Sequence, residues 1–144
     1  GISSALPDKD SMDMADFASA LCSGSDCARR SVINPVEGTM LTVIREGAFA
    51  VKNAVLSGSV ADFQGLFAFL LGVLEKQVEL TPTLLKVLEY AGVVDSGAKG
   101  LLRIFEGMDL VLCGSMPDST PERIPDGTTC ATERALAVRC HPAQ

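Results

Sequence analysis

Apolar residues recur three and four positions apart along most of residues 13–113, and no segment alternates apolar and polar residues as a strand does. The clearest pattern runs over residues 37–56, where charged side chains such as Arg45 and Lys52 fall on the face opposite the apolar ones. The pattern therefore predicts an all-α fold. The predicted helices cover residues 13–30, 37–56, 60–79, 82–91 and 96–113.

Residues that favour helix starts support several of these boundaries. Asp13 is a candidate N-cap for the first helix, because its carboxylate can accept hydrogen bonds from the free N–H groups of the first turn. Thr81 as a cap and Pro82 at the first helical position predict the start of a short fourth helix. Asp95 or Ser96 is expected to cap the fifth helix.

The predicted helix over residues 60–79 is apolar nearly all round, which is typical of a central, buried helix. Cys22 and Cys113 lie among apolar residues of other predicted helices, where a free cysteine is usually part of the core. These features predict one helical domain over residues 13–114, preceded by a lead-in loop over residues 1–12. Residues 115–144 are predicted to be a linker or tail, because three of the seven prolines fall between 115 and 130.

Composition narrows the class of protein further. The formal net charge of −6 leaves no basic surface for nucleic acid, and aromatic residues make up only 5% of the chain. The longest uncharged run, residues 63–74, is shorter than the roughly 20 residues that a membrane-spanning helix needs. Five cysteines without a Cys-x-x-Cys pair favour reduced thiols and a cytoplasmic location over a disulfide framework. The first residues, Gly-Ile-Ser-Ser without a methionine, suggest a cut inside a longer protein.

Generic catalytic motifs do not occur in the sequence. The chain has one histidine, His141, which falls in the predicted tail together with Cys130 and Cys140, and these three lack a fourth ligand for zinc. Neither a P-loop nor a Gly-x-Gly-x-x-Gly motif occurs. We therefore assign no catalytic residue and no metal ligand from these patterns.

Two segments have the local chemistry of an anion site. Residues 35–41 place Gly38 and Thr39 at the start of a helix, where free N–H groups, a hydroxyl and the positive end of the helix dipole favour phosphate. Residues 91–100 repeat this arrangement with Asp95, Ser96 and two glycines at the start of the fifth helix. The alternative is that both are ordinary capped helix starts.

The same two segments carry a family resemblance. Residues 37–46 (Glu-Gly-Thr-Met-Leu-Thr-Val-Ile-Arg-Glu), the Thr81-Pro82 and Leu84-Leu85 pairs, and residues 91–100 (Ala-Gly-Val-Val-Asp-Ser-Gly-Ala-Lys-Gly) resemble the later half of the kinase domain of bacterial fatty acid kinases. These are relatives of the nucleotide-binding L-subunit of dihydroxyacetone kinase. The resemblance covers about residues 10–113.

The resemblance implies an antiparallel helical barrel that holds ADP or ATP through magnesium at one end. The metal ligands in that family come from an Asp-Gly-Asp-x-Gly-x-Asn type loop, and this sequence contains no such loop. Arg45 is expected to be a solvated surface charge instead of a ligand contact. The residues that match the family's nucleotide-binding positions are Gly38, Thr39, Met40, Asp95, Ser96 and Gly97.

The function implied is that of a fragment of an ATP-dependent kinase domain. The parent protein would phosphorylate a fatty acid carboxylate that a lipid-binding partner presents, giving an acyl phosphate. Without the magnesium loop, the chain alone is expected to be inactive or nearly so. The alternatives are a dihydroxyacetone (glycerone) kinase subunit and a non-catalytic helical interaction module. The expected partners are the missing N-terminal half of the domain, the fatty-acid-binding protein and, as another alternative, a second copy of the chain.

Overall fold

The computed structural model describes residues 1–6 and 11–115, and this part of the chain contains helices and no strand. The prediction of an all-α fold is therefore confirmed. The elements are the short 3₁₀-helix η1 (Ser3–Ala5) and five α-helices: α1 (Met14–Ser31), α2 (Met40–Ser57), α3 (Phe63–Leu84), α4 (Lys86–Ala91) and α5 (Ser96–Leu112).

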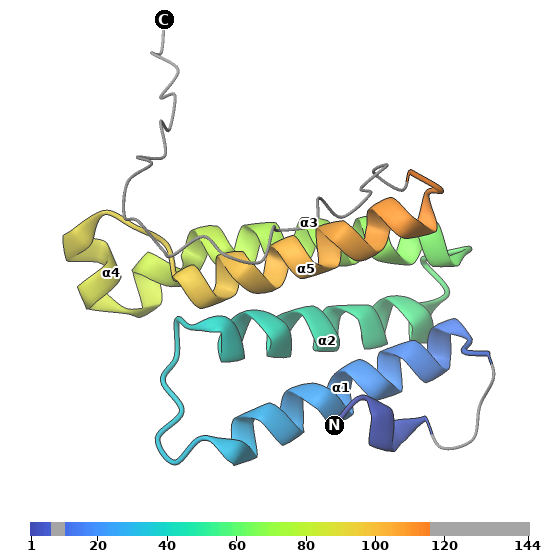
Figure 1. The fold of residues 1–144 in the computed structure, drawn as a ribbon, viewed down its shortest axis with the longest axis horizontal. Helices are drawn as coiled ribbons and strands as arrows, with labels where there is room; N and C mark the ends of the chain where they lie inside the picture. Colours follow the sequence, from blue (N-terminus) through green and yellow to red (C-terminus); the bar gives the residue numbers. More distant parts are fainter. Residues whose placement is uncertain (7–10, 116–144) are drawn as a thin grey trace, which may run out of the picture.

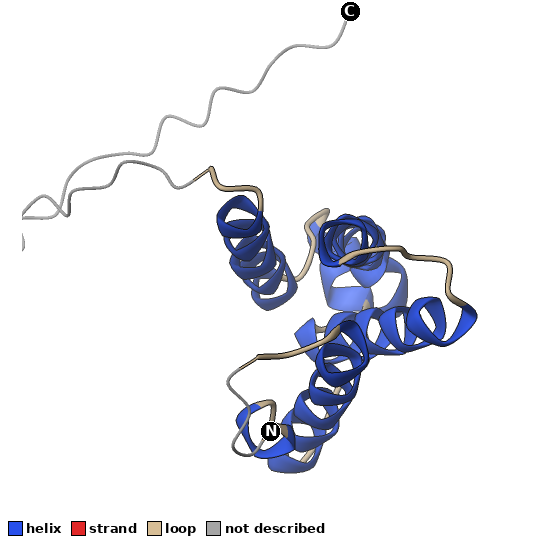
Figure 2. Cartoon of the chain, turned by 90° about the vertical axis from the view of Figure 1, so that its right-hand side faces the viewer, coloured by secondary structure: helices blue, strands red, loops and turns tan. Residues whose placement is uncertain are grey.

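The four long helices run back and forth along one direction (Figure 1). Helix α1 packs on α2, α2 packs on α3 and α5, and α3 packs on α5. Figure 2 shows the helices from the right-hand side of Figure 1, roughly along the length of the bundle, with the N-terminus at the bottom. The N-terminus of α2, the end of α3, helix α4 and the N-terminus of α5 all lie at the same end of the bundle (Figure 1).

A single apolar core joins the four long helices. Leucines and valines at helical spacing fill its centre, including Val43 of α2, Leu70 of α3 and Leu102 of α5, each no more than 2% exposed. Four phenylalanine rings extend the core between α1, α3 and α5, with centroids 5.2–6.4 Å apart, a spacing typical of favourable ring pairs. These rings belong to Phe17, Phe63, Phe67 and Phe105.

Aspartate side chains start three of the helices. Asp13 caps α1, as predicted, and forms a reciprocal capping box with Asp16. The carboxylate of Asp62 accepts a hydrogen bond from the amide of Gly65 at the start of α3. Asp95, and not Ser96, is the N-cap of α5. Each carboxylate satisfies an N–H group that a helix start leaves without an intrahelical partner.

Helix α2 begins at Met40, three residues later than the predicted start at residue 37. The reason is the backbone of Gly38, whose φ of +81° lies in the left-handed region and cannot continue a right-handed helix. The apolar periodicity extends across this turn, so the pattern alone placed the boundary too early.

The predicted helix start at Thr81-Pro82 is wrong. Helix α3 continues through Pro82 to Leu84, and the break falls at Leu85, whose extended backbone precedes α4. Pro82 has no N–H group to donate to the carbonyl of Val78 four residues earlier. The hydroxyl of Thr81 donates to that carbonyl instead, at 2.6 Å, so the helix passes the proline without leaving the carbonyl unpaired.

Two expectations about burial need correction. Helix α3 is buried on one side only, and Phe69 on its other side is 41% exposed, because α2 and α5 cover a single face of it. Cys113 is exposed because it is the C-cap of α5, whereas Cys22 is partly buried. Burial raises the pKa of the Cys22 thiol.

The lead-in predicted as a loop over residues 1–12 contains the short helix η1. Beyond residue 115, the predicted linker or tail lies outside the residues that the structure describes.

Candidate functional site

The two segments that the sequence analysis singled out meet at one end of the bundle. The carboxylate of Asp95, at the start of α5, accepts a hydrogen bond from the amide of Met40, at the start of α2, at 3.1 Å. The same oxygen, Oδ2, accepts from the amide of Ala98 at 2.7 Å. One carboxylate oxygen therefore joins the positive ends of two helices, which is where an anion is most stable.

The backbone of Asp95 is also held in place. Its amide donates to the hydroxyl oxygen of Thr81 in α3, at 3.0 Å. Thr81 has no exposed surface, and its hydroxyl is the group that donates to the carbonyl of Val78. Asp95 thus connects three helices: α3 through its amide, and α2 and α5 through its side chain.

Gly38 faces the break between α3 and α4. A Cβ atom on Gly38 would lie 3.0 Å from the Cβ of Leu84 and 2.9 Å from the Cβ of Leu85. Such distances are shorter than real Cβ atoms tolerate, so only glycine allows the turn before α2 to pack against the end of α3. This contact is made by the protein itself and occupies the face that the sequence analysis assigned to a nucleotide.

Thr39 and Gly97 lie on either side of Met40. Thr39 occupies the N-cap position of α2, but its hydroxyl donates to the carbonyl of Val36, at 2.8 Å, and caps no amide. A Cβ atom on Gly97 would lie 3.3 Å from the Sδ of Met40, so the first turn of α5 packs closely on the first turn of α2. The structure therefore brings together Thr39, Met40, Asp95 and Gly97.

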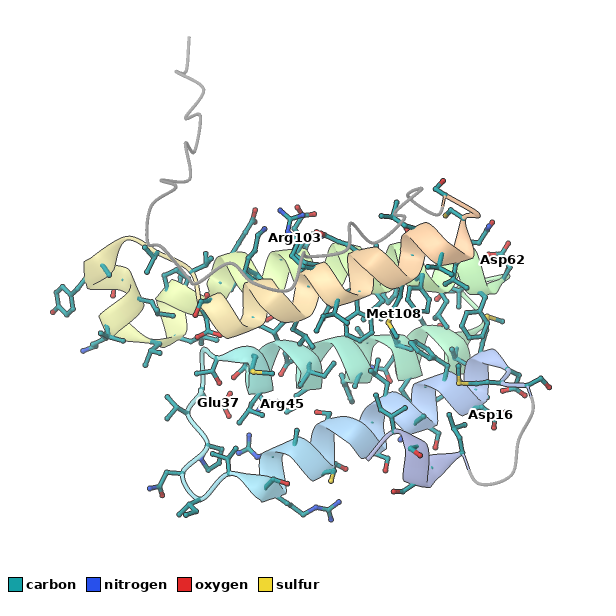
Figure 3. All side chains as sticks on the ribbon, viewed as in Figure 1. Asp16, Glu37, Arg45, Asp62, Arg103 and Met108 are labelled. Carbon is teal, nitrogen blue, oxygen red and sulfur yellow. The ribbon has the colours of Figure 1, made fainter. Side chains whose placement is uncertain are left out.

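Ser96 points to a different hollow. An open pocket of about 710 Å³ lies beside the first turns of α5, between it and the loop that follows α4. Ser96, Lys99 and Arg103 line this pocket together with glycines and valines. In Figure 3 Arg103 points away from α2, so the pocket and the contact with Met40 lie on different sides of α5.

Lys99 and Arg103 were not assigned to the site from the sequence. The signal that could have found them is helical spacing, because positions three and seven residues after Ser96 fall on the same face of a helix. The guanidinium of Arg103 pairs with Glu106 at 2.6 Å. Lys99 is thus the cation nearest in sequence to the candidate residues on α5, one turn from Ser96.

Glu37 is the centre of a cluster of charges before α2. Its Oε1 accepts from the guanidinium groups of Arg45, at 2.8 Å, and Arg29, at 3.1 Å, and its Oε2 accepts from the hydroxyl of Thr42 at 2.6 Å. These hydrogen bonds, Arg45 first, lower the pKa of Glu37 to about 2. Arg45 also forms an ion pair with Glu46, so its guanidinium is held at the surface by two carboxylates and is not simply solvated (Figure 3).

An apolar groove of about 610 Å³ opens between α1, α2 and α5. Met108 of α5 points into the space between α5 and α2 (Figure 3). Ile2 and Leu6 of the N-terminal segment line the groove. Ile2 packs closely on Gly24 of α1, since a Cβ atom on Gly24 would lie 2.6 Å from the Cγ1 of Ile2. The groove's large side chains include Phe17, Leu21, Met40, Ile44, Ile104 and Phe105.

The described residues do not fit a magnesium ion. Within residues 1–6 and 11–115, no three side chains of His, Cys, Asp or Glu gather closely enough to hold a metal. Asp95, the acid nearest to the candidate site, has its Oδ2 occupied by two amides.

Within residues 1–6 and 11–115, no helix combines the length and apolar character needed to cross a membrane.

The described residues form an all-α arrangement in which Asp95 joins the starts of α2 and α5. Residues 1–109 match the family model described as the DAK2 domain. The chain belongs to the DAK2 domain family.

Several curated proteins are similar to the chain. Protein YloV of Bacillus subtilis (strain 168) is 40% identical over 107 residues, which are 74% of this chain and 19% of YloV. An uncharacterized protein of Staphylococcus haemolyticus is 38% identical over 108 residues, or 75% of this chain and 19% of that protein. An uncharacterized protein of Staphylococcus aureus (strain USA300) is 35% identical over 108 residues, with the same shares. The chain spans about a fifth of the length of these relatives.

Proposed function

We propose that this chain forms part of the nucleotide-binding wall of an ATP-dependent kinase that acts in the cytoplasm. The observation that supports it is the junction at Asp95, which brings the starts of α2 and α5 to one point. Membership of the DAK2 family supports the same chemistry. The proposed wall includes the residues matched to the family, which are Gly38, Thr39, Met40, Asp95, Ser96 and Gly97. Of these, Ser96 and Gly97 are the proposed direct contacts to the nucleotide.

The phosphates of ATP are proposed to lie against the first turn of α5. Its first amides, those of Ser96 and Gly97, have no intrahelical acceptor and can donate to phosphate oxygens. Lys99 lines the same hollow as Ser96 and adds a positive charge one turn further on. Asp95 remains in its capping position in this arrangement, so its role is to hold the two helix starts together.

The acceptor is proposed to be a fatty acid carboxylate that a lipid-binding protein presents. A carboxylate oxygen attacks the γ-phosphorus of ATP, the bond from that phosphorus to the bridging oxygen breaks, and acyl phosphate and ADP result. In phosphoryl transfer of this kind, positioning and charge neutralisation do most of the work. We assign no step to a metal ion, because the described residues hold no ligand set for one.

A calorimetric titration of Mg-ATP into the full gene product that carries this chain tests the proposal. Lys99→Ala is expected to weaken binding about tenfold to a hundredfold, because it removes a charged contact to phosphate. Thr39→Val tests whether the α2 side of the junction also contributes to nucleotide binding. Lys52→Ala removes the same charge from the distant half of α2 and is the control for Lys99. Cys22→Ser is the control for Thr39, because the Cys22 thiol contacts the carbonyl of Ala48 in the middle of α2.

The outcome that contradicts the proposal is equal binding by all four variants, or no binding by the unmodified protein. A non-catalytic helical module would then be the better description. If nucleotide binds, the acceptor is identified by supplying a fatty acid with its carrier or dihydroxyacetone, and measuring which is phosphorylated. Phosphorylation of dihydroxyacetone alone would replace the fatty acid with the ketose as substrate.

A further inference from the structure

A buried hydroxyl lies between the proline of α3 and the helix junction at the candidate site. Thr81 is fully buried, and its Oγ1 donates to the carbonyl of Val78 while accepting from the amide of Asp95. A hydroxyl has one hydrogen to donate and two lone pairs, so it can do both at once. Neither valine nor alanine can replace it in either bond.

The effect of this hydroxyl extends beyond its own contacts. The hydroxyl holds the backbone of Asp95 in place through the Asp95 amide. The position of that backbone determines where the Asp95 side chain lies, and its Oδ2 accepts hydrogen bonds from the amides of Ala98 and Met40. Met40 itself makes no hydrogen bond to Thr81. The hydrogen-bonded route from Thr81 to the amide of Met40 therefore passes through Asp95.

Thr83, two residues further along α3, provides an internal comparison. Its hydroxyl donates to the carbonyl of Leu80 at 2.7 Å, which is the same three-residue relationship that Thr81 has to Val78. Thr83 is exposed, and the hydrogen bonds of the described residues give it no contact with α5. The two threonines thus share one local bond and differ in the contact with Asp95.

We propose that Thr81 is a positioning residue for the DAK2-type site: its hydroxyl sets the Asp95 carboxylate that aligns the starts of α2 and α5. This inference rests on the proposed nucleotide function for its consequence in binding, although the alignment itself is independent of any ligand. Pro82, which follows Thr81, contributes to this positioning. Because Pro82 frees the Val78 carbonyl, the Thr81 hydroxyl is oriented by a bond within its own helix.

Hydrogen exchange of single amides in the full gene product tests the alignment. Thr81→Val is expected to accelerate exchange of the Asp95 and Met40 amides about tenfold, the effect of losing one hydrogen bond. Thr81→Ser keeps the hydroxyl and is expected to restore the slow rates. Thr83→Val removes only the local bond and is expected to leave both amides unchanged.

A double variant separates positioning from general damage to α3. Pro82→Ala supplies an N–H for the Val78 carbonyl, so Thr81→Val in that background leaves no unpaired carbonyl in the helix. Relative to Pro82→Ala alone, the double variant is still expected to accelerate exchange at Met40 about tenfold. Unchanged exchange at Met40, or equal acceleration by Thr83→Val, would overturn the proposal.

Nucleotide binding is the second measurement. The double variant is expected to bind Mg-ATP about tenfold more weakly than Pro82→Ala, while Thr83→Val binds as the unmodified protein does. If no form of the protein binds Mg-ATP, the proposed nucleotide function fails, and the exchange at Met40 still decides whether Thr81 positions Asp95. If nucleotide binds and the double variant matches Pro82→Ala in affinity, Thr81 has no positioning role for the site.

Discussion

Gly38 lies so close to Leu85 that no side chain fits between them. A Cβ atom on Gly38 would lie 2.9 Å from the Cβ of Leu85 and 3.1 Å from its backbone nitrogen. The φ of Gly38, +81°, is a second reason for glycine at this position. The glycine is therefore required by the packing of the turn before α2 on the end of α3, whatever the site binds.

We expect Gly38→Ala to lower the free energy of unfolding by about 2–4 kcal/mol. The left-handed backbone costs about 1 kcal/mol for a residue with a side chain, and overpacking adds about 1–3 kcal/mol. Gly58→Ala is the matched control, since Gly58 has a φ of +65° and open space around it. Urea unfolding measures both variants, and equal losses would show that the contact with Leu85 is unimportant.

A second pair of glycines tests the contact between α2 and α3. A Cβ atom on Gly47 would lie 2.7 Å from a methyl carbon of Leu74 and 3.2 Å from one of Leu70, whereas Gly72 has nothing within 4 Å. Gly47→Ala is expected to be about 1–3 kcal/mol less stable than Gly72→Ala, because only the alanine at position 47 overpacks against the two leucines. Gly72→Ala is expected to stabilise the protein by about 0.5–1 kcal/mol through helix propensity. Thermal unfolding in which both variants gain stability equally would contradict the close packing.

The Glu37 cluster predicts a dependence of stability on pH and salt. The pKa of Glu37 in the folded protein, about 2, is below its ordinary value of 4.5, so its contribution is present above pH 4.5 and is lost as the pH falls toward 2. Its side chain is 47% exposed, so solvent screening limits the effect to less than about 1 kcal/mol. Unfolding of Glu37→Gln against the unmodified protein, at pH 7 and pH 2.5 and in 1 M salt, measures it.

Glu75→Gln, on an exposed position of α3, is the control for the loss of one negative charge. The difference between Glu37→Gln and the unmodified protein should shrink at pH 2.5 and at high salt, whereas Glu75→Gln should show no such change. A difference for Glu37→Gln that is the same at both pH values would mean that the arginine contacts do not stabilise the folded state.

The apolar groove predicts self-association of the 144-residue chain. Ile104 and Met108 line the groove and are 62% and 48% exposed, which adds to an apolar surface that favours contact with a second copy. Ile104→Glu is expected to lower the average mass that light scattering measures at high protein concentration. Val111→Glu, on the same helix but outside the groove, is the control. A monomer at all concentrations would contradict this prediction.

The sequence predicted the elements of the fold well, because each long helix has an apolar face and three of the four have an aspartate at the N-cap. It misplaced four boundaries by three to five residues: the starts of α2, α3 and α4 and the end of α3. Local features explain all of these except the start of α3. The turn at Gly38 interrupts an otherwise regular pattern, and Pro82 lies inside a helix because the Thr81 hydroxyl compensates for the missing N–H. Propensity treats threonine and proline separately, so it could not anticipate a bond that needs both.

For the candidate site, the sequence singled out two segments that the structure brings into contact, but it did not give their geometry. That Asp95 would meet Met40 depends on how α5 packs across α2, which no local pattern contains. The contact of Gly38 with Leu84 and Leu85 likewise depends on where α3 ends. Whether the six matched residues bind nucleotide stays a prediction, which the titration described above tests at Thr39.

The loop from Gly58 to Asp62 has a practical consequence. It joins α2 to α3 at the end of the bundle opposite the start of α5 (Figure 1), and a Cβ atom on Gly58 would meet no atom within 4 Å. Exposed loops of this kind tolerate insertions well. A fluorescent probe or an affinity tag placed in this loop would be separated from the junction of α2, α3 and α5 by nearly the full length of the helices. It would therefore leave that junction unchanged.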